Sequence, residues 1–229
     1  MFKKHTYDDQ DKIREIVADV YGIKIEKLSY LHLHRQDLYK NDPLRFADGT
    51  TEWHNEADTL FHKEFYNHLN SKNGKDVKNW YSNFIVNQVS PWFSESFLYQ
   101  RAPSFRIHLP NLQAIQKWHY DSDVDHGHPL WEINFHIPVT NTFASNAIWI
   151  ESVPGLKDFS PVELKDGEYT IFDGNRCTHG NKINKTSYTR ISFDFRVMPI
   201  RLYDENTTKI SATTKRRFAI GEYYELYEK

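Results

Sequence analysis

Residues 190–197 read RISFDFRV, and this stretch decides the fold that we expect for the chain. Its apolar side chains alternate with polar ones, which is the period of a β-strand with two different faces. The stretches EINFHIPV (132–139) and SFRIHLP (104–110) alternate in the same way. Their polar faces carry Arg, Asn, His and Ser rather than the Lys, Glu and Thr usual on a solvated sheet. We therefore expect these faces to line the inside of a barrel.

Short segments rich in turn residues separate the other apolar runs of the second half. They are TNTFASN (140–146), VPGLKD (153–158), KDGE (165–168) and FDGNRC (172–177). Several short strands joined by such turns indicate a sandwich or a small barrel. We expect a mainly β protein with some α-helix, in which residues 97–203 form a β-barrel or jelly roll.

The first 96 residues predict mainly helices, because three segments carry apolar side chains at helical spacing. These segments are residues 8–22, 55–74 and 75–93. We expect the helices to cover the outer, apolar face of one sheet within a single domain of residues 1–229.

Two further segments complete this prediction. Residues 204–229 form a C-terminal tail that Phe218, Tyr223 and Tyr224 attach to the barrel. Residues 30–39 hold a His-x-His pair, His32 and His34, without a carboxylate at metal-ligand spacing. We interpret that pair as one face of a strand.

Composition excludes several classes of partner. A formal net charge of -2, from 29 basic and 31 acidic residues, gives no electrostatic reason to expect nucleic acid or an anionic membrane. The single cysteine, Cys177, excludes an intramolecular disulfide and fits a reducing compartment. Neither a signal-peptide core nor a membrane-spanning apolar run is visible. We expect a cytoplasmic protein that acts on a small molecule.

Residues 118–132, WHYDSDVDHGHPLWE, concentrate seven possible metal ligands, and two interpretations compete. In the first, His119 and Asp121 lie two apart on one strand face and share an ion with His179, sixty residues later. Two histidines and one carboxylate form a facial triad, which leaves open positions on Fe(II). Arg190, eleven residues after His179, shares a strand face with Ser192, and this pair suits a carboxylate ligand.

The second interpretation uses His126, His128 and Glu132, again with His179. This spacing resembles the metal motif of cupins, which are also barrels. Gly127 interrupts the stretch and favours a loop, in which the two imidazoles need not be parallel. A third interpretation is a sugar-binding jelly roll without redox chemistry.

Longer strings point to a known family. His119-x-Asp121, NAIWIESVPG (146–155), GEYTIFDGNRCTHGNKIN (167–184) and TRISFDFRVMP (189–199) together resemble the Fe(II)/2-oxoglutarate-dependent dioxygenases of the phytanoyl-hydroxylase-like superfamily. Within it, FRIHLPN, WHYDSD and EINFHIPVT are similar to the StrG-type branch of streptomycin-biosynthesis proteins. The resemblance covers residues 103–199, and none of its motifs lies in the first hundred residues.

The resemblance implies a double-stranded β-helix and a ligand set. His119, Asp121 and His179 would hold Fe(II), and Arg190 with Ser192 would bind the distal carboxylate of 2-oxoglutarate. The implied reaction is hydroxylation of a small polar metabolite, such as a sugar, a cyclitol or an amino-acid-derived intermediate, with release of succinate and CO2. Because Asp121 is kept, the sequence departs from the halogenating variants.

Further roles are expected around this centre. Asn134 would help to fix 2-oxoglutarate, and Glu132 would orient a ligand from behind. The expected substrate contacts are Arg106, His108, Asp123 and His136.

Overall fold

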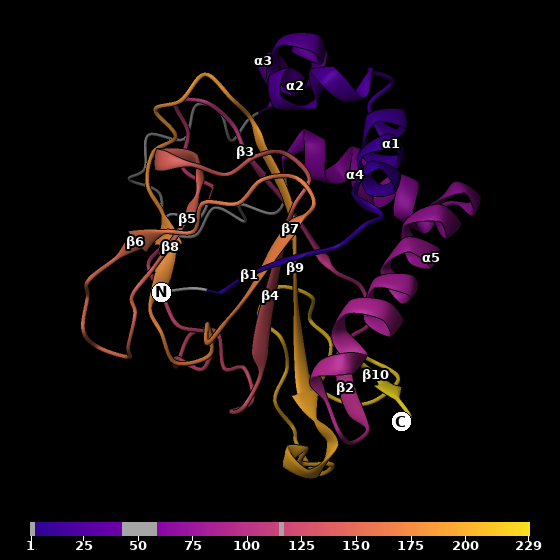
Figure 1. Ribbon diagram of the computed structural model, residues 1–229, viewed down its shortest axis with the longest axis vertical. Coiled ribbons are helices and arrows are strands. Elements are labelled where there is room, and N and C mark those ends of the chain that lie inside the picture. The colour runs from indigo at the N-terminus through magenta and orange to yellow at the C-terminus, as the bar shows by residue number, and fades with distance from the viewer. Residues whose placement is uncertain (1–2, 43–58, 115–116) are drawn as a thin grey trace.

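The computed structural model describes residues 3–42, 59–114 and 117–229, so residues 55–58 of the predicted second helix lie outside the described part. Two antiparallel sheets and a group of N-terminal helices make up the fold. Figure 1 shows helices α1, α4 and α5 along one face of the larger sheet and the smaller sheet on its other side.

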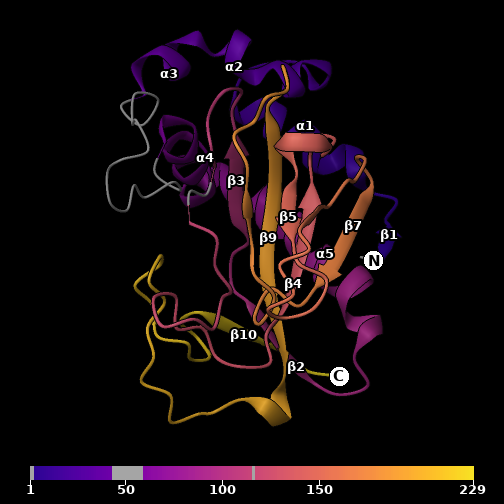
Figure 2. The ribbon, with the colours of Figure 1, turned by 90° about the vertical axis from the view of Figure 1, so that its left-hand side faces the viewer.

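The larger sheet has seven strands, and its central strand is the stretch on which the fold prediction rests. Its order is β1 (Lys4–Thr6), β7 (Glu168–Phe172), β4 (Ile133–Pro138), β9 (Arg190–Pro199), β2 (Phe97–Gln100) and β10 (Tyr224–Tyr227), with β3 (Ser104–His108) also paired to β9. Arg106 lies opposite Ser192, and His136 lies opposite Asp194. The three predicted alternating strands are therefore neighbours, since β3 and β4 both pair with β9 (Figure 2).

The smaller sheet has three strands, in the order β6 (Ser160–Pro161), β5 (Ile148–Ile150) and β8 (His179–Asn181). Ile148 and Ile150 belong to a buried cluster that also contains Phe172 of β7 and Cys177. Cys177 is thus a packing residue, and burial raises the pKa of its thiol to about 11.

The long helices form where their apolar periodicity predicted them. They are α1 (Gln10–Val20), α4 (Leu60–Asn70) and α5 (Lys75–Phe84), which continues as a π-helix (Ile85–Val89) and a 3-10 turn (Ser90–Trp92). The hydroxyl of Thr59 caps α4 by accepting from the His62 amide. Aromatic rings then join helix to sheet: Phe65 of α4 stacks on Phe105 of β3 with ring centroids 4.1 Å apart.

In the N-terminal part of the chain, one segment was predicted wrongly. Residues 30–39 are helical rather than extended, in a 3-10 helix (Ile25–Tyr30), α2 (Leu31–His34) and α3 (Gln36–Asn41). His32 is buried, and its Nδ1 lies 2.7 Å from Thr189 Oγ1. The alternation His-Leu-His was too short to outweigh the helical packing of its neighbours.

Both ends of the described chain reach the larger sheet. β1 pairs with β7, and β10 pairs with β2, so sheet residues extend beyond the predicted range 97–203. Phe218, Tyr223 and Tyr224 pack against Leu98 and Met198, as expected for the tail.

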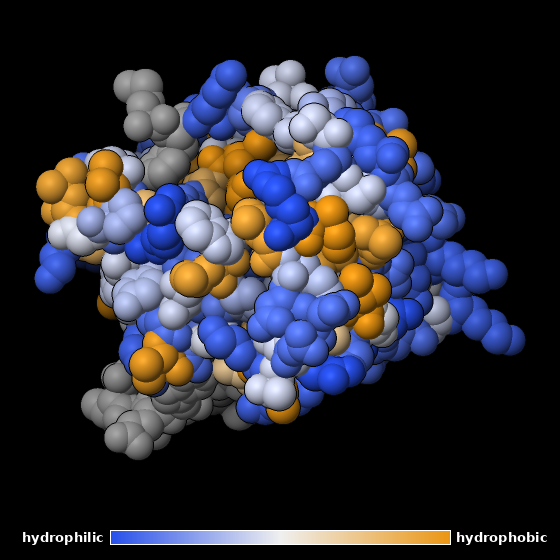
Figure 3. Space-filling view, turned by 90° about the horizontal axis from the view of Figure 1, so that it is seen from below, coloured by the Kyte–Doolittle hydropathy of each residue, from blue (hydrophilic) through white to orange (hydrophobic). Residues whose placement is uncertain are grey.

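The surface carries mixed polarity. The face seen from below has separate hydrophobic groups among a hydrophilic majority (Figure 3). Across the described ranges, none of the helices combines the length and the hydropathy that a bilayer crossing requires.

Candidate metal centre

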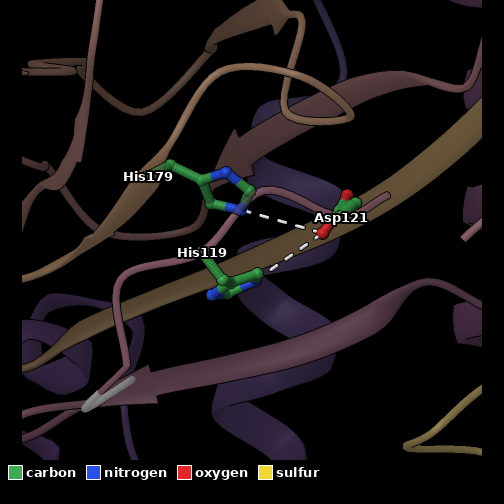
Figure 4. A group of neighbouring side chains, drawn as sticks. All are labelled: His119, Asp121 and His179. Atoms are coloured by element: carbon green, nitrogen blue, oxygen red, sulfur yellow. Dashed lines mark ion pairs between the residues drawn. The ribbon is translucent and has the colours of Figure 1, made fainter. Parts of the chain in front are cut away.

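His119, Asp121 and His179 come together between the two sheets (Figure 4). One ligand atom from each lies within 4.8 Å of the others. Nε2 of His119 is 3.7 Å from Asp121 Oδ1, and Nε2 of His179 is 3.8 Å from the same oxygen. Both imidazoles point at one carboxylate oxygen, and this arrangement can surround a single ion.

The backbone explains how residues so far apart in sequence meet. His119 and His179 form an isolated antiparallel bridge, in which each amide donates to the other carbonyl at 3.1 and 2.8 Å. The strand predicted for His119 and Asp121 does not form beyond this bridge, because the chain turns after His119. Asp121 is held instead by its amide, which donates to the Gly174 carbonyl at 2.9 Å.

The orientation of each imidazole is fixed from behind. Nδ1 of His119 lies 3.0 Å from the Lys117 carbonyl, and Nδ1 of His179 lies 3.1 Å from the Cys177 carbonyl. A neutral imidazole that donates a hydrogen bond from Nδ1 leaves the lone pair of Nε2 available to bind a metal. Burial, together with the neighbouring His119, lowers the pKa of His179 to about 4, so this imidazole is neutral near pH 7.

Asp121 is a fully buried carboxylate with strong partners. Arg196 Nε donates to Asp121 Oδ2 at 2.8 Å, and Arg196 Nη2 donates to Oδ1 at 3.0 Å. Asn134 Nδ2 donates to Oδ2 at 2.7 Å. Burial alone would raise the pKa of Asp121, but the Arg196 guanidinium holds it well below its usual range. The carboxylate is therefore ionised and available as a ligand.

The residues of the cupin-like alternative do not form one group in the described part of the chain. His128 Nδ1 lies 2.7 Å from Glu132 Oε2, and the His126 ring stacks on His119 with centroids 4.0 Å apart. Gly127 has a φ of 63°, as expected for a turn rather than a strand. The cluster that meets metal-ligand spacing is His119, Asp121 and His179.

The residues predicted to bind 2-oxoglutarate lie in two separate places. Arg190 and Ser192 are completely buried on β9, where Arg190 Nη1 donates to the Asn146 carbonyl at 3.1 Å. Arg190 Nε and Ser192 Oγ have no hydrogen-bond partner among the residues that the structure describes. Asn134 lies beside the triad, where it donates to Asp121 rather than standing free for a co-substrate.

A pocket opens next to the triad and receives some of the predicted substrate residues. Its lining residues from the larger sheet are Arg106, Asn134, Phe172, Asp194 and Arg196, and those from the smaller sheet are Ile148, His179, Gly180 and Asn181, with His119 between them.

The four predicted substrate contacts differ in position. Arg106 lines the pocket and donates to Asp194 Oδ2 at 3.1 Å. His136 is buried behind it, with Nδ1 2.5 Å from Asp194 Oδ1. His108 faces the backbone carbonyls of Asn146 and Leu112 instead of the pocket, and burial lowers its pKa to about 3. Asp123 forms a hydrogen bond within its own loop, where its Oδ1 accepts from the His126 amide at 2.8 Å.

Arg196 and Asp194 were not assigned to the site from the sequence. Alternation placed both on the polar face of residues 190–197, which was the available signal. Their partners Asp121 and Arg106 come from distant segments. A local period could not have predicted these pairs.

The comparisons with known proteins decide the family. No family model matches the chain. The streptomycin biosynthesis protein StrG of Streptomyces griseus is 32% identical over 214 residues, which are 93% of this chain and 98% of that protein. The chain belongs to the StrG family. The resemblance of residues 103–199 to the StrG-type branch is thus confirmed, and the StrG match extends into the helical N-terminal part as well.

Similarity to solved structures is weaker than similarity to StrG. A non-heme monooxygenase, ThoJ in complex with nickel, gives a TM-score of 0.47 at 11% identity, over 92% of this chain and 77% of that one. CytC3 with Fe(II) and alpha-ketoglutarate gives 0.46 at 17% identity, over 87% and 76%. AviO1 from Streptomyces viridochromogenes Tue57 gives 0.44 at 15% identity, over 87% and 90%. Likenesses this distant carry no argument about the chemistry of the StrG-family chain.

Proposed function

We propose that this protein is an Fe(II)- and 2-oxoglutarate-dependent oxygenase that hydroxylates a small polar metabolite. The observation that carries the proposal is the convergence of His119, Asp121 and His179 on one point beside a pocket. Two imidazoles and one carboxylate on one side of an ion leave the opposite positions open for a co-substrate and oxygen. We also propose that the two sheets form a double-stranded β-helix around this centre.

Unpaired donors support a carboxylate ligand at the far end of β9. Arg190 Nε, Asn146 Nδ2 and Ser192 Oγ are buried, and none of them has a hydrogen-bond partner in the described part of the chain. An arginine without a carboxylate is costly to bury, and burial lowers its pKa to about 10. In the described residues, no carboxylate oxygen lies within ion-pair distance of Arg190. The distal carboxylate of 2-oxoglutarate would supply the missing anion and accept from these donors.

Unpaired acceptors support a polar substrate closer to the triad. Asn134 and Asn181 each donate through Nδ2, to Asp121 at 2.7 Å and to the Ala147 carbonyl at 3.2 Å. These bonds fix both amides, so each Oδ1 is left buried without a donor from any described residue. Both residues line the pocket. 2-Oxoglutarate offers no donors, whereas hydroxyl or ammonium groups of a sugar-like metabolite would satisfy both oxygens.

The chain's own part in such a reaction is binding and orientation. Iron with 2-oxoglutarate and O2, when bound, supplies the oxidising power that removes hydrogen from a carbon and releases succinate and CO2. His119, Asp121 and His179 would hold the metal, and Arg190 with Ser192 would hold the co-substrate. Arg106 and His136, through Asp194, would shape the polar wall that the substrate meets. These side chains are buried except for Arg106, which is partly exposed, and their burial limits the access of water to the group.

Metal binding and 2-oxoglutarate turnover test the proposal directly. The purified protein with Fe(II) should convert 2-oxoglutarate into succinate, slowly in the absence of substrate. Asp121→Ala and His179→Ala should abolish metal binding, measured by calorimetry with Mn(II), because each removes one of three ligands.

His128→Ala is the matched control, because it removes a histidine from the same stretch that lies outside the triad. We expect it to retain metal. Loss of metal in His128→Ala with retention in Asp121→Ala would overturn the ligand set and favour the cupin-like alternative.

A further inference from the structure

The carboxylate of Asp121 has almost no free lone pair. An ionised carboxylate offers about four acceptor positions on its two oxygens. Oδ2 accepts from Asn134 Nδ2 and Arg196 Nε, and Oδ1 accepts from Arg196 Nη2. One position therefore remains, on Oδ1, which is also the oxygen that both imidazoles face at 3.7 and 3.8 Å.

This arrangement restricts how Asp121 can bind an ion. A carboxylate with one free position on Oδ1 coordinates through one oxygen. If Oδ2 were released, the same carboxylate could chelate the ion with both oxygens and fill a coordination position that 2-oxoglutarate needs. The two parallel bonds of the Arg196 fork fix both the position and the rotation of the carboxylate.

Arg196 also contacts Gln100 and Glu132, and the C-terminal segment holds both of these residues. Its Nη1 donates to Gln100 Oε1 at 3.5 Å, and Tyr223 donates to the same Oε1 at 3.0 Å. Its Nε lies 4.0 Å from Glu132 Oε2. The Tyr224 hydroxyl donates to Glu132 Oε1. Tyr223 and Tyr224 belong to the tail, and β10, which begins at Tyr224, pairs with β2.

We propose that Arg196 is a positioning residue that makes Asp121 a one-oxygen metal ligand, and that Tyr223 and Tyr224 keep Arg196 in place. This inference rests on the proposed metal centre and adds a role that the ligand set alone does not contain. The C-terminal segment then serves the metal centre as well as packing against the sheet.

Spectra of the Co(II)-loaded protein test this proposal, because they report coordination independently of turnover. Arg196→Gln should still bind Co(II) but with an altered ligand-field spectrum. Its Mn(II)-loaded form should bind 2-oxoglutarate about tenfold more weakly, measured by calorimetry, as expected when a group supporting a metal ligand is lost. Arg196→Lys should not restore the spectrum, since an ammonium cannot form the fork.

Two further variants keep the test decisive. Tyr224→Phe removes one hydroxyl and should produce the same spectral change to a smaller extent, even if Arg196→Gln does not fold. Arg106→Gln is the matched control, because it removes another arginine paired with a carboxylate in the same pocket. It should leave the Co(II) spectrum unchanged.

The outcomes separate this inference from the proposed function. If the unmodified protein binds no metal through His119, Asp121 and His179, the proposed function fails. If it binds metal and 2-oxoglutarate, but Arg196→Lys and Tyr224→Phe both keep its Co(II) spectrum and its affinity for 2-oxoglutarate, the positioning role alone is wrong.

Discussion

Arg190 shows at the scale of a single residue what a buried charge requires. Its side chain is completely buried. Among the described residues its Nε has no partner, and its one hydrogen bond goes to a backbone carbonyl. Asp194 is the nearby anion that favours its charge, but that carboxylate is already engaged by Arg106 and His136. A buried guanidinium without its own carboxylate partner favours the binding of an anionic ligand.

Replacement of Arg190 should affect the co-substrate and spare the metal. We expect Arg190→Gln to weaken 2-oxoglutarate binding about 10- to 100-fold, because a hydrogen bond to a charged group contributes about 1.5–3 kcal/mol. Affinity for Mn(II) should stay unchanged, since Arg190 does not contact the triad. Ser192→Ala, which removes a neutral partner, should cost less than tenfold. Equal loss of metal and of 2-oxoglutarate in Arg190→Gln would contradict this role.

At the scale of elements, the turn between β7 and β8 positions Asp121 of the candidate metal centre. The Gly174 carbonyl accepts from the Asp121 amide, and the Asn175 carbonyl accepts from the Ser122 amide at 3.1 Å. The side chains of Phe172 and Asn134 occupy the space that a side chain at position 174 would need. A Cβ there would lie 2.6 Å from Phe172 Cε2 and 2.8 Å from Asn134 Cγ. The turn therefore packs directly against the amide that supports Asp121.

A methyl group at Gly174 should disturb the metal centre through Asn134. Gly174→Ala forces Asn134 or Phe172 to move, which should cost about 1–3 kcal/mol of unfolding free energy and change the Co(II) spectrum. Gly155→Ala is the matched control, because Gly155 has a φ of 82° and open space around it. It should lose stability through backbone strain but keep the Co(II) spectrum. An unchanged spectrum in Gly174→Ala would show that Asn134 does not need its present position.

At the scale of the whole molecule, several histidines from different elements are buried in the folded chain. His62 of α4, His108 of β3 and His179 of β8 lie on three different elements. Burial lowers the pKa of His62 and His108 to about 3 and that of His179 to about 4. Each is neutral in the folded chain at a pH where the same residue in an unfolded chain takes up a proton.

Stability of the metal-free protein should therefore fall as the pH is lowered from about 6.5 to 4. In this window the unfolded chain binds up to three more protons than the folded one through these histidines. The unfolding free energy should change by up to about 4 kcal/mol per pH unit. Urea denaturation with a chelator present measures this slope. His62→Asn should lower the difference in bound protons between the unfolded and folded chains by about one, and the slope should fall in proportion. A flat profile across the window would contradict the buried neutral state.

The sequence by itself determined the strand faces and the types of the candidate ligands. Alternation along β3, β4 and β9 depends only on local geometry, so it predicted which side chains are buried together. The local alternation predicted an extended conformation for residues 30–39, but packing with the neighbouring helices made this segment helical. It also predicted a strand from His119 to Asp121, where a turn brings the carboxylate into position.

Only the tertiary structure decided which members of WHYDSDVDHGHPLWE share one point and what supports them. His119 joins His179 through a backbone bridge, whereas His128 pairs with Glu132 four residues later. Arg196 reaches Asp121 across 75 positions of sequence. Contacts of this kind depend on how β8, β9 and the C-terminal segment pack against one another. No period in the sequence encodes that packing, because it is the joint result of all the buried surfaces.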